Sequence, residues 1–430
     1  MQKFNYLIIG NSAGAVGCIE GLRTVDKNGT IAVVSEESHH VYSRALIPYY
    51  LDGKVNKENM HYRPQDFYQR AGVTLFSGQR ASEVHFDTKE VVMAGGERLG
   101  YEKLLLATGG KPIVPPIPGL DKSNVFTFLS MDDVLKIEKS LAGAKDAVVL
   151  GGGVIGLMAA EVLKKKGLNV HVLELAPRVL APVIDETASD IVESSFKEVG
   201  VEIATNNTIQ EIHGQETVDK IVLKDGTVLS CDLLVVGVGV SPRVDLVANT
   251  AIKIERGIVV DQKMQTSVPD VYACGDCASI YDFITGENRP LPLWPNAYSG
   301  GRVAAFNMAG KSRYYTWGTG MNSMHFFDTN IINAGMNVSE ENDQNLEIIT
   351  KVEKEKRIYR KFVINEQGHI KGFALIGEVA RAGILLNLIR SKVDVRPFKQ
   401  KLLEEDFGYA HMHEELRWQL LKDDVVLGVI

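Results

Sequence analysis

Three glycines stand with the spacing G-x-G-x-x-G at Gly151, Gly153 and Gly156, directly after the apolar run 146–150. The first glycine of this pattern permits a tight turn, the second lets the backbone approach a pyrophosphate, and the third lets the next helix pack against the strand. That helix directs free N–H groups and the positive end of its dipole at the phosphates. The pattern therefore predicts a dinucleotide site, and a glycine-rich packing turn is the alternative.

Glu174 lies in the next apolar stretch, 168–176, where this motif places an acidic residue. A carboxylate at that point accepts a hydrogen bond from a ribose 2′-hydroxyl and repels a 2′-phosphate. We therefore expect NAD(H) to be preferred over NADP(H). The nearby Arg178 keeps this preference from being strict, because an arginine there can accommodate a 2′-phosphate.

A variant of the same turn lies near the N-terminus, with Gly10, Ser12, Gly14 and Ala15. Serine and alanine fill the second and third glycine positions, yet small residues still allow close approach, and the Ser12 hydroxyl can itself meet a phosphate. Glu36 is the ribose-binding candidate after the next apolar run. The strand–turn–helix–strand order thus occurs twice, and we expect a second nucleotide site here.

Composition and charge exclude several other classes of protein. The 430 residues are 45% hydrophobic and 23% charged, as in folded globular chains, and suit roughly three domains of about 150 residues. A net charge of −7 argues against a nucleic-acid partner and an acidic membrane surface. Four cysteines are not a disulfide framework, so we expect a cytoplasmic location. No apolar run reaches the roughly 18 residues of a membrane span.

Five segments stand in the order typical of the pyridine nucleotide–disulfide oxidoreductase family, which this chain resembles. They are IIGNSAGA (8–15), LLLATGG (104–110), GGGVIG (151–156), VVGVGVSP (235–242) and VYACGDCA (271–278). The resemblance implies an α/β fold with two Rossmann-like, doubly wound nucleotide-binding domains, the second inserted in the first. It also implies a C-terminal α+β interface domain that often dimerises.

The same resemblance divides the chain into domains and assigns their cofactors. It implies FAD on a domain made of 1–112 and 252–325, NAD(H) on 113–251, and an interface domain at 326–430. Apolar segments of the last domain are predicted as antiparallel strands: 325–336, 346–364 and 369–377.

Flavin contacts follow by carrying the family's motifs over residue by residue. The small-residue turn Ala107, Thr108 and Gly109 would lie against the flavin nucleotide, and Ala81 would contact the adenine. These roles rest on the resemblance alone.

Contacts around the reactive rings are assigned in the same way. Asp276 would bind a ribityl hydroxyl. A helix starting at Pro295 and Asn296 would direct its N-terminus at the flavin pyrimidine edge, where its dipole stabilises reduced flavin. Gly237 and Gly239 would flank the nicotinamide.

One departure from the family concerns sulfur chemistry. Thiol-dependent members carry a redox cysteine just before a Leu-Pro-Tyr-Tyr-like stretch, whereas SRALIPYY (43–50) has Ala45 at that position. Thiolate chemistry on that face of the flavin is therefore not expected. The Tyr-Ser-Arg sequence at 42–44 instead resembles the cysteine-free branch of the family: rubredoxin and ferredoxin reductases and the flavin part of assimilatory nitrite reductase. This resemblance implies that Arg44 lies near the FAD pyrophosphate.

The remaining cysteines and histidines are interpreted as packing or surface residues. Cys274 and Cys277 form a nominal C-x-x-C, but the Gly-Asp between them already serves the flavin, and no second pair completes a zinc site. The pairs 39–40 and 411/413 lack a matching carboxylate or cysteine spacing. We predict no metal site and no acid–base catalytic residue, because hydride transfer needs none.

Together these features predict an FAD-dependent NADH:acceptor oxidoreductase that passes electrons to an external acceptor. With no internal thiol relay, the expected partner is an iron–sulfur protein: ferredoxin, rubredoxin or an iron–sulfur subunit of a larger complex. Basic residues at 351–361 and 390–401 form either a patch that attracts such an acidic partner or an ordinary charged face. An NADH oxidase using oxygen and a flavin-bearing assembly subunit are the alternatives, and a homodimer is plausible.

Overall fold

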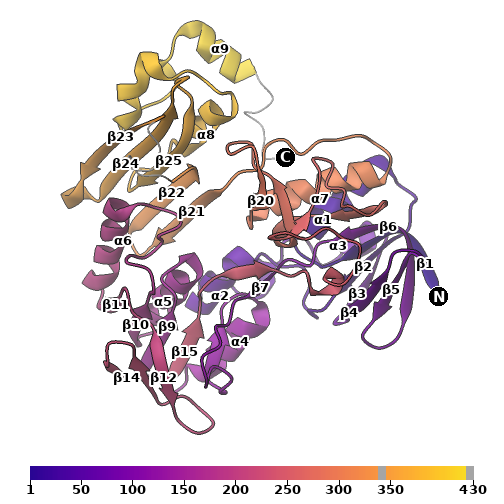
Figure 1. Ribbon diagram of the computed structural model, residues 1–430, viewed down its shortest axis with the longest axis horizontal. Coiled ribbons are helices and arrows are strands. Elements are labelled where there is room, and N and C mark those ends of the chain that lie inside the picture. The colour runs from indigo at the N-terminus through magenta and orange to yellow at the C-terminus, as the bar shows by residue number, and fades with distance from the viewer. Residues whose placement is uncertain (338–344, 423–430) are drawn as a thin grey trace. The chain divides into compact units, whose positions relative to one another are not determined.

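The computed structural model describes residues 1–337 and 345–422, which form two compact units (Figure 1). Unit 1 comprises Met1–Pro116, Phe126–Gly143 and Val238–Thr319. Unit 2 comprises Ile117–Val125, Ala144–Gly237 and the described residues from Gly320 onward. The chain thus leaves unit 1 and returns to it, while the three-domain division expected above stays a prediction.

Unit 1 is built on a seven-stranded sheet in which β3-β2-β1-β6-β5-β4 are neighbours and β18 also pairs with β6. The strands are β1 (Gln2–Ile9), β2 (Ile31–Ser35), β3 (Val73–Ser77), β4 (Ala81–His85), β5 (Glu90–Met93), β6 (Arg98–Leu106) and β18 (Val271–Ala273). β1, β2, β3, β6 and β18 pair in parallel. All five residues of β2, IAVVS, are buried, as a central parallel strand requires.

Two helices of unit 1 cross at unusually short range, namely α1 (Ala13–Val25) and α7 (Trp294–Met308). A Cβ added at Gly17 would fall on the carbonyl of Tyr298, and one added at Gly301 would fall on the carbonyl of Gly14. Only glycine fits at these contacts, which we call the glycine seam between α1 and α7. The glycine seam therefore fixes where the N-termini of both helices point.

Shorter elements complete unit 1. They are α2 (Ile47–Asp52), α3 (Phe67–Arg70), β7 (Gly110–Pro112), α4 (Met131–Ser140), β16 (Val240–Pro242), β17 (Ile258–Val259), β19 (Ala278–Tyr281) and β20 (Asn288–Pro290). β7 and β16 form an antiparallel pair. Helix α4 starts with a full capping box between Ser130 and Asp133, which satisfies its first free N–H groups.

Four strands of unit 2 belong to a five-stranded sheet in the order β11-β10-β9-β15-β8, whose edge strand β8 crosses the boundary between the two units in the sequence. Its strands are β8 (Val125–Thr127), β9 (Asp146–Leu150), β10 (Asn169–Leu173), β11 (Val201–Ala204) and β15 (Leu233–Val236), and its helices are α5 (Val154–Lys165) and α6 (Glu186–Glu198). A three-stranded sheet follows: β12 (Ile209–His213), β13 (Lys220–Leu223) and β14 (Val228–Ser230). The Asp225-Gly226 turn joins β13 to β14, which pair in antiparallel fashion.

The last part of unit 2 is an antiparallel sheet in the order β21-β22-β25-β24-β23. It consists of β21 (Met321–Phe326), β22 (Thr329–Gly335), β23 (Leu346–Glu353), β24 (Ile358–Asn365) and β25 (Ile370–Ile376), followed by α8 (Ala382–Arg390) and α9 (Glu414–Lys422). Antiparallel strands were predicted here, but the segment 325–336 spans a hairpin instead of one strand. The turn falls at Phe327, whose φ of 53° is left-handed.

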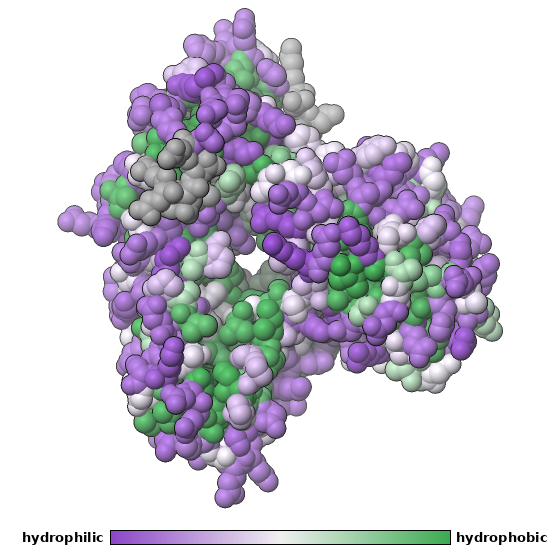
Figure 2. Space-filling model, viewed as in Figure 1, coloured by the Kyte–Doolittle hydropathy of each residue, from purple (hydrophilic) through white to green (hydrophobic). Residues whose placement is uncertain are grey.

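Surface polarity differs between regions of the face shown in Figure 2. Hydrophobic residues gather around β15, whereas hydrophilic residues cover most of the surface over α9. Within the described residues, no helix combines the length and the apolar character that spanning a membrane demands.

Candidate nucleotide-binding sites

The first glycine turn leads from β1 into α1. Gly10 has φ +112°, and an added Cβ would collide with the carbonyl of Ala107, so only glycine serves here. Ser12 is the N-cap residue of α1 but its hydroxyl makes no capping hydrogen bond. The first N–H groups of α1 and this hydroxyl therefore remain available to a phosphate.

A cavity of about 590 Å³ lies at this turn and is lined entirely by residues of unit 1. It brings together many of the residues predicted from the sequence: Gly10, Ser12, Gly14, Glu36, Arg44, Ala107, Thr108, Gly109 and Asp276. These come from five separate stretches of the chain, so their assembly is a result of the fold. Ala15 is placed differently, since it is fully buried in α1 and packs in the core.

An adjoining cavity of about 320 Å³ shares Gly10, Glu36 and Thr108 with the first and adds Ala81. Glu36 accepts a hydrogen bond from the guanidinium of Arg243 at 2.6 Å. The backbone of Arg243 is itself fixed, because its N–H donates to the carbonyl of Gly109 and its carbonyl accepts from Thr108 Oγ1. Sequence reasoning missed Arg243, which follows the second nucleotide-binding stretch and gives no local signal.

Arg44 is held by a network that was also not foreseen. Its guanidinium pairs with Glu37 and donates to the carbonyl of Leu129 at 2.9 Å. Tyr42 donates to the other oxygen of Glu37 at 2.6 Å and accepts the N–H of Met131 at 2.9 Å. The start of α4 is thereby attached to the 37–44 loop, and Arg44 is fixed at the cavity wall.

Asp276 lies in a single turn of 3-10 helix after β18. Burial raises the pKa of this carboxyl, and the nearby Arg44 partly opposes the rise. A buried carboxyl of this kind requires hydrogen-bond donors, and a ribityl hydroxyl supplies one. Its position in the cavity wall fits the role that the family resemblance assigned to it.

The first turn of α7 reaches the same cavity through Trp294 and Ala297. Pro295 and Asn296 lie in this turn, but neither is among the lining residues of the cavity. The Asn296 side chain donates to the carbonyl of Thr319 and accepts from Tyr315, and so anchors the turn. No side chain caps α7, which leaves its first N–H groups free.

No cysteine that lines this cavity has a thiol that ionises readily. Ala45 lines the wall where thiol-dependent relatives carry their cysteine. Cys274 also lines it but is fully buried, and burial raises its pKa well above the ordinary value. All four cysteines are free and buried. Cys274 and Cys277 therefore act as small packing residues, and the Cys274 sulfur would lie 2.7 Å from a Cβ added at Gly14.

The second glycine turn leads from β9 into α5 in unit 2. Gly151 has φ +115°, and a Cβ added at Gly156 would collide with the Gly151 carbonyl. By contrast, a Cβ added at Gly153 would meet nothing within 4 Å. The turn thus needs Gly151 and Gly156 for its own fold, and the space beside Gly153 is open for a ligand.

Glu174 is fixed on this turn by two backbone hydrogen bonds. One carboxylate oxygen accepts the N–H of Gly152 at 2.6 Å and the other accepts the N–H of Ala176 at 2.7 Å. An ionised carboxylate has about four acceptor positions, so a ribose hydroxyl can still bind. Arg178 lies close by, and its buried Nε has no hydrogen-bond partner among the described residues.

The chain passes from unit 2 to unit 1 between Gly237 and Gly239. Gly237 belongs to unit 2, where an added Cβ would lie 2.9 Å from the Cα of Gly156. Gly239 belongs to unit 1 and has φ +118°. Their predicted place beside the nicotinamide stays a prediction.

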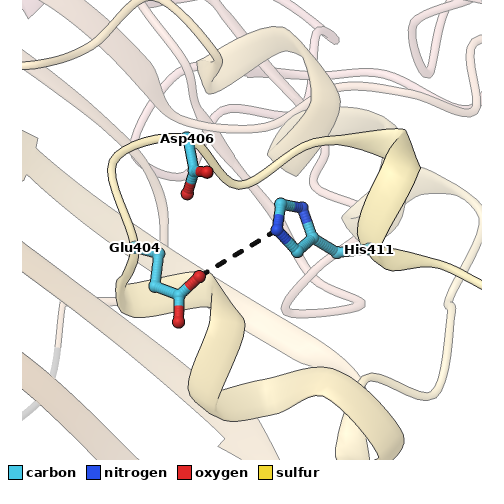
Figure 3. Close-up of side chains that lie close together, drawn as sticks. All are labelled: Glu404, Asp406 and His411. Carbon is cyan, nitrogen blue, oxygen red and sulfur yellow. Dashed lines mark ion pairs between the residues drawn. The ribbon is translucent and has the colours of Figure 1, made fainter.

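A cluster of Glu404, Asp406 and His411 was not foreseen, because their spacing matches no ligand pattern (Figure 3). His411 Nε2 lies 4.0 Å from Glu404, and His411 Nδ1 accepts the N–H of Gly408 at 3.3 Å. That bond places the proton of a neutral ring on Nε2, the atom that faces the carboxylates. A neutral ring of this kind has no lone pair on Nε2 for a metal, and a protonated ring would form an ion pair with Glu404.

Both parts of the chain match known protein families. Residues 4–301 match the pyridine nucleotide-disulphide oxidoreductase family, and residues 321–393 match the C-terminal domain of rubredoxin NAD+ reductase. The chain therefore belongs to the pyridine nucleotide-disulphide oxidoreductase family, as the five sequence segments predicted. It is an oxidoreductase with two Rossmann-like domains that uses FAD and NAD(H).

Individual relatives cover nearly the whole chain. The epsilon subunit of NADH-dependent phenylglyoxylate dehydrogenase from Aromatoleum evansii is 32% identical over 421 residues, which is 97% of this chain and 99% of that protein. An NADH oxidase from Methanocaldococcus jannaschii is 30% identical, with 94% of both chains covered. The solved structure of an NAD-dependent persulfide reductase from A. fulgidus is 27% identical, covers 92% of this chain and 78% of that one, and has a TM-score of 0.85.

The residues present fit both cofactors. In unit 1, free N–H groups of α1, the buried carboxyl of Asp276 and the Arg44 guanidinium match the phosphate and hydroxyl groups of FAD. In unit 2, the open space at Gly153 and the fixed carboxylate of Glu174 match the pyrophosphate and ribose of NAD(H).

Proposed function

We propose that this chain takes hydride from NADH onto FAD and passes the electrons to an iron–sulfur protein. The observation that carries the proposal is the flavin cavity itself, which has Ala45 in place of the relatives' cysteine and a protonated, buried Cys274. Without a thiolate beside the flavin, the electrons have no internal disulfide to reduce. They must leave to an acceptor outside the chain.

The chain's own residues bind and orient in this reaction. Backbone N–H groups at the starts of α1 and α5 hold pyrophosphates, and Glu36 and Glu174 select riboses. The free N-terminus of α7 stabilises negative charge on the reduced ring. The flavin supplies the redox chemistry, accepting hydride as a pair of electrons and releasing single electrons. No side chain is required as an acid or base.

Two of the similarities to known proteins support the kind of acceptor that we propose. The C-terminal match is to a rubredoxin reductase domain, and the Aromatoleum relative is a subunit of a larger NADH-dependent enzyme. A ferredoxin, a rubredoxin or an iron–sulfur subunit of a complex is the acceptor that we propose. Assembly as a homodimer or within such a complex, and a cytoplasmic location, belong to the same proposal.

An NADH oxidase is the second candidate, favoured by the Methanocaldococcus relative. The flavin cavity argues against its peroxidase and water-forming variants, since no thiolate is present to form a sulfenate. A flavin-bearing assembly subunit that does not turn over is the third candidate.

An anaerobic titration tests the proposal. Stoichiometric NADH is expected to bleach the flavin band of the purified protein, and NADPH to do so much less. Oxidised rubredoxin or a plant-type [2Fe–2S] ferredoxin, added next, is expected to restore the band within seconds, faster than air does. Reoxidation by air alone would support the oxidase, and no bleaching by either nucleotide would overturn the oxidoreductase assignment of the isolated chain.

A further inference from the structure

An open cavity of about 600 Å³ in unit 1 is not used by either cofactor site. It lies between the second half of α1 with the residues that follow it and the stretch from Arg63 to Gly72, which includes α3. Ile19, Pro64, Phe67 and Ala71 give it an apolar floor. We call it the α1–α3 groove.

Most of the charged residues that line this groove are cations. Arg23, Lys27, Arg63 and Arg70 line it, against the single carboxylate of Glu20. Glu20 is already engaged, because it pairs with Arg63 through two hydrogen bonds of 2.6 and 3.1 Å. The other three cations are therefore not neutralised by any carboxylate of the lining.

Among the described residues, none of these three cations is held in a short ion pair. The Arg23 guanidinium donates to the carbonyls of Ala71, Asp26 and Gly72, and the Asp26 carboxylate offsets its charge only in part, without forming an ion pair with it. Lys27 is exposed and makes no ion pair with any residue that the structure describes. Within the described parts of the chain, Arg70 pairs only with Asp66, at 3.5 Å and with both side chains more than half exposed, where water screens the attraction.

The basic stretch predicted from the sequence behaves differently. Most of its cations are paired with carboxylates: Lys351 and Lys356 with Glu353, Arg357 with Glu198 and Asp328, Lys361 with Asp185, Arg396 with Asp394, Lys399 with Glu347 and Lys401 with Glu404. This pairing favours the ordinary charged face, one of the two interpretations above, over a patch for an acidic partner. The whole chain has a net charge of −7, whereas the α1–α3 groove is locally positive and can attract an acidic protein.

A chain of ring contacts joins the groove to the flavin cavity. Trp294 lines the flavin cavity and packs edge-on against Tyr62, with ring centroids 4.8 Å apart. The Arg63 guanidinium lies over the Tyr62 ring at 4.2 Å and lines the groove. Because electron tunnelling weakens steeply with distance, a carrier seated in the groove gains from this continuous packing.

We propose that the α1–α3 groove is the docking surface for an acidic one-electron iron–sulfur protein, with Trp294 and Tyr62 between that protein and the flavin cavity. The inference rests on the proposed function and names where its partner binds. One hydride from NADH supplies two electrons, two oxidised carriers take one electron each in turn, and one proton is released with NAD+. The apolar floor and cationic rim match the rim-and-core pattern of transient protein interfaces.

A pair of charge-reversal variants tests the docking surface. Lys27→Glu/Arg70→Glu changes the groove, and Lys3→Glu/Lys253→Glu is the matched control in unit 1. The control also changes one exposed unpaired lysine and one cation of an exposed ion pair. Binding of oxidised [2Fe–2S] ferredoxin and of rubredoxin is measured by calorimetry at low and at high salt, on the FAD-loaded protein.

The groove variant is expected to bind at least about tenfold more weakly at low salt and to lose most of the salt dependence, while the control binds like the parent chain. Flavin bleaching by NADH is expected to be the same in all three proteins. Equal losses in both variants, or no loss in the groove variant, would overturn the docking surface but leave the proposed function standing. If neither carrier oxidises the reduced parent chain, the proposed function fails as well.

A second pair of variants tests the ring contacts. Trp294→Leu is expected to slow reoxidation by bound carrier, per mole of flavin, by at least about tenfold with an unchanged carrier affinity. Trp317→Leu is the control, since Trp317 is half exposed and packs on Phe283 outside the flavin cavity. An unchanged reoxidation rate in Trp294→Leu, or an equal fall in both, would exclude the Trp294–Tyr62 route.

Discussion

Glu36 and Arg243 form a 2.6 Å ion pair although 207 positions separate them in the sequence. The acid comes from the end of the first strand–turn–helix–strand unit, and the arginine from the segment that re-enters unit 1 after the inserted stretch. The pair therefore joins the adenosine end of the predicted FAD site to the point where the chain returns. If Glu36 binds the FAD ribose as predicted, FAD binding depends on both parts of a discontinuous unit.

The first prediction concerns this pair. Glu36→Ala is expected to weaken FAD binding by about 10- to 100-fold, because hydrogen bonds to a charged group contribute roughly 1.5–3 kcal/mol. Arg243→Ala is expected to weaken it less, since the carboxylate that binds ribose remains. Fluorescence titration of the apoprotein with FAD measures both effects. The exposed Glu83→Ala is the control, and equal affinity in Glu36→Ala and the control would contradict the assignment.

A second prediction separates two glycines of the NAD(H) turn. Gly156→Ala places a methyl group on the Gly151 carbonyl and is expected to lower the melting temperature and abolish bleaching by NADH. Gly153→Ala meets no protein atom and is expected to keep the melting temperature but raise the dissociation constant for NADH. Thermal unfolding and anaerobic titration of both variants check this. A Gly153→Ala protein with parental NADH affinity would remove Gly153 from the site.

The third prediction concerns the choice between NADH and NADPH. Glu174→Ala is expected to lower the affinity for NADH, because Gly152 and Ala176 lose their acceptor, and to raise the NADPH/NADH ratio about tenfold or more as repulsion of the 2′-phosphate disappears. Adding Arg178→Ala is expected to reverse the gain for NADPH. Separate bleaching titrations measure the ratio, and a ratio unaffected by Glu174→Ala would refute the role of this carboxylate.

A fourth prediction is a pH dependence in unit 2. Burial alone would raise the pKa of Asp185, but hydrogen bonds from Lys361, at 2.8 Å, and Tyr359 outweigh it and leave the pKa below its ordinary value. A depressed carboxyl pKa stabilises the fold above the unfolded-state pKa of about 3.9, and this stability is lost as the pH falls through the lower folded-state pKa. Asp185→Asn is therefore expected to be destabilising at pH 7.

The burial of Lys361 sets the expected loss of stability in Asp185→Asn. Removing one partner of a buried ion pair costs about 3–5 kcal/mol, and Lys361 is only 5% exposed. Melting curves of parent and Asp185→Asn between pH 7 and pH 3 should converge at the acidic end. Glu193→Gln, which breaks an exposed-lysine pair on the same helix, is expected to change little. A difference that persists at pH 3 would count against the ion pair as its cause.

How much the sequence predicts depends on the range of the interaction. Both glycine turns were found because their constraints are local: Gly10 and Gly151 need a left-handed backbone within a few residues of a strand. Asp276 and the 107–109 turn were placed by resemblance, and the fold brings them to one cavity. The ion pair from Arg243 could not be predicted, since no spacing rule connects it with Glu36.

The charged surfaces show the same limit. A run of cations around 351–401 left two interpretations open in the sequence, a basic patch or an ordinary charged face. The carboxylates that pair with Arg357 and Lys361 are Glu198 of α6 and its N-cap residue Asp185, far away in the chain. The α1–α3 groove escaped notice because Arg23 and Arg70 are distant in sequence and neither belongs to a charge run. Net local charge is a property of the folded surface.

The glycine seam between α1 and α7 has a consequence for cofactor length. Gly17 and Gly301 leave no room for the two helices to slide, so the separation between their N-termini is set by the protein. Residues at the starts of both helices line the same cavity. We expect a bound FAD to place its phosphates at the N-terminus of α1 and its ring at the N-terminus of α7. A flavin without its adenylate half would fill only the ring end and would leave the N–H groups of α1 and the Glu36–Arg243 pair without a ligand. We therefore expect the fixed distance between the two helix starts to favour FAD over the shorter FMN.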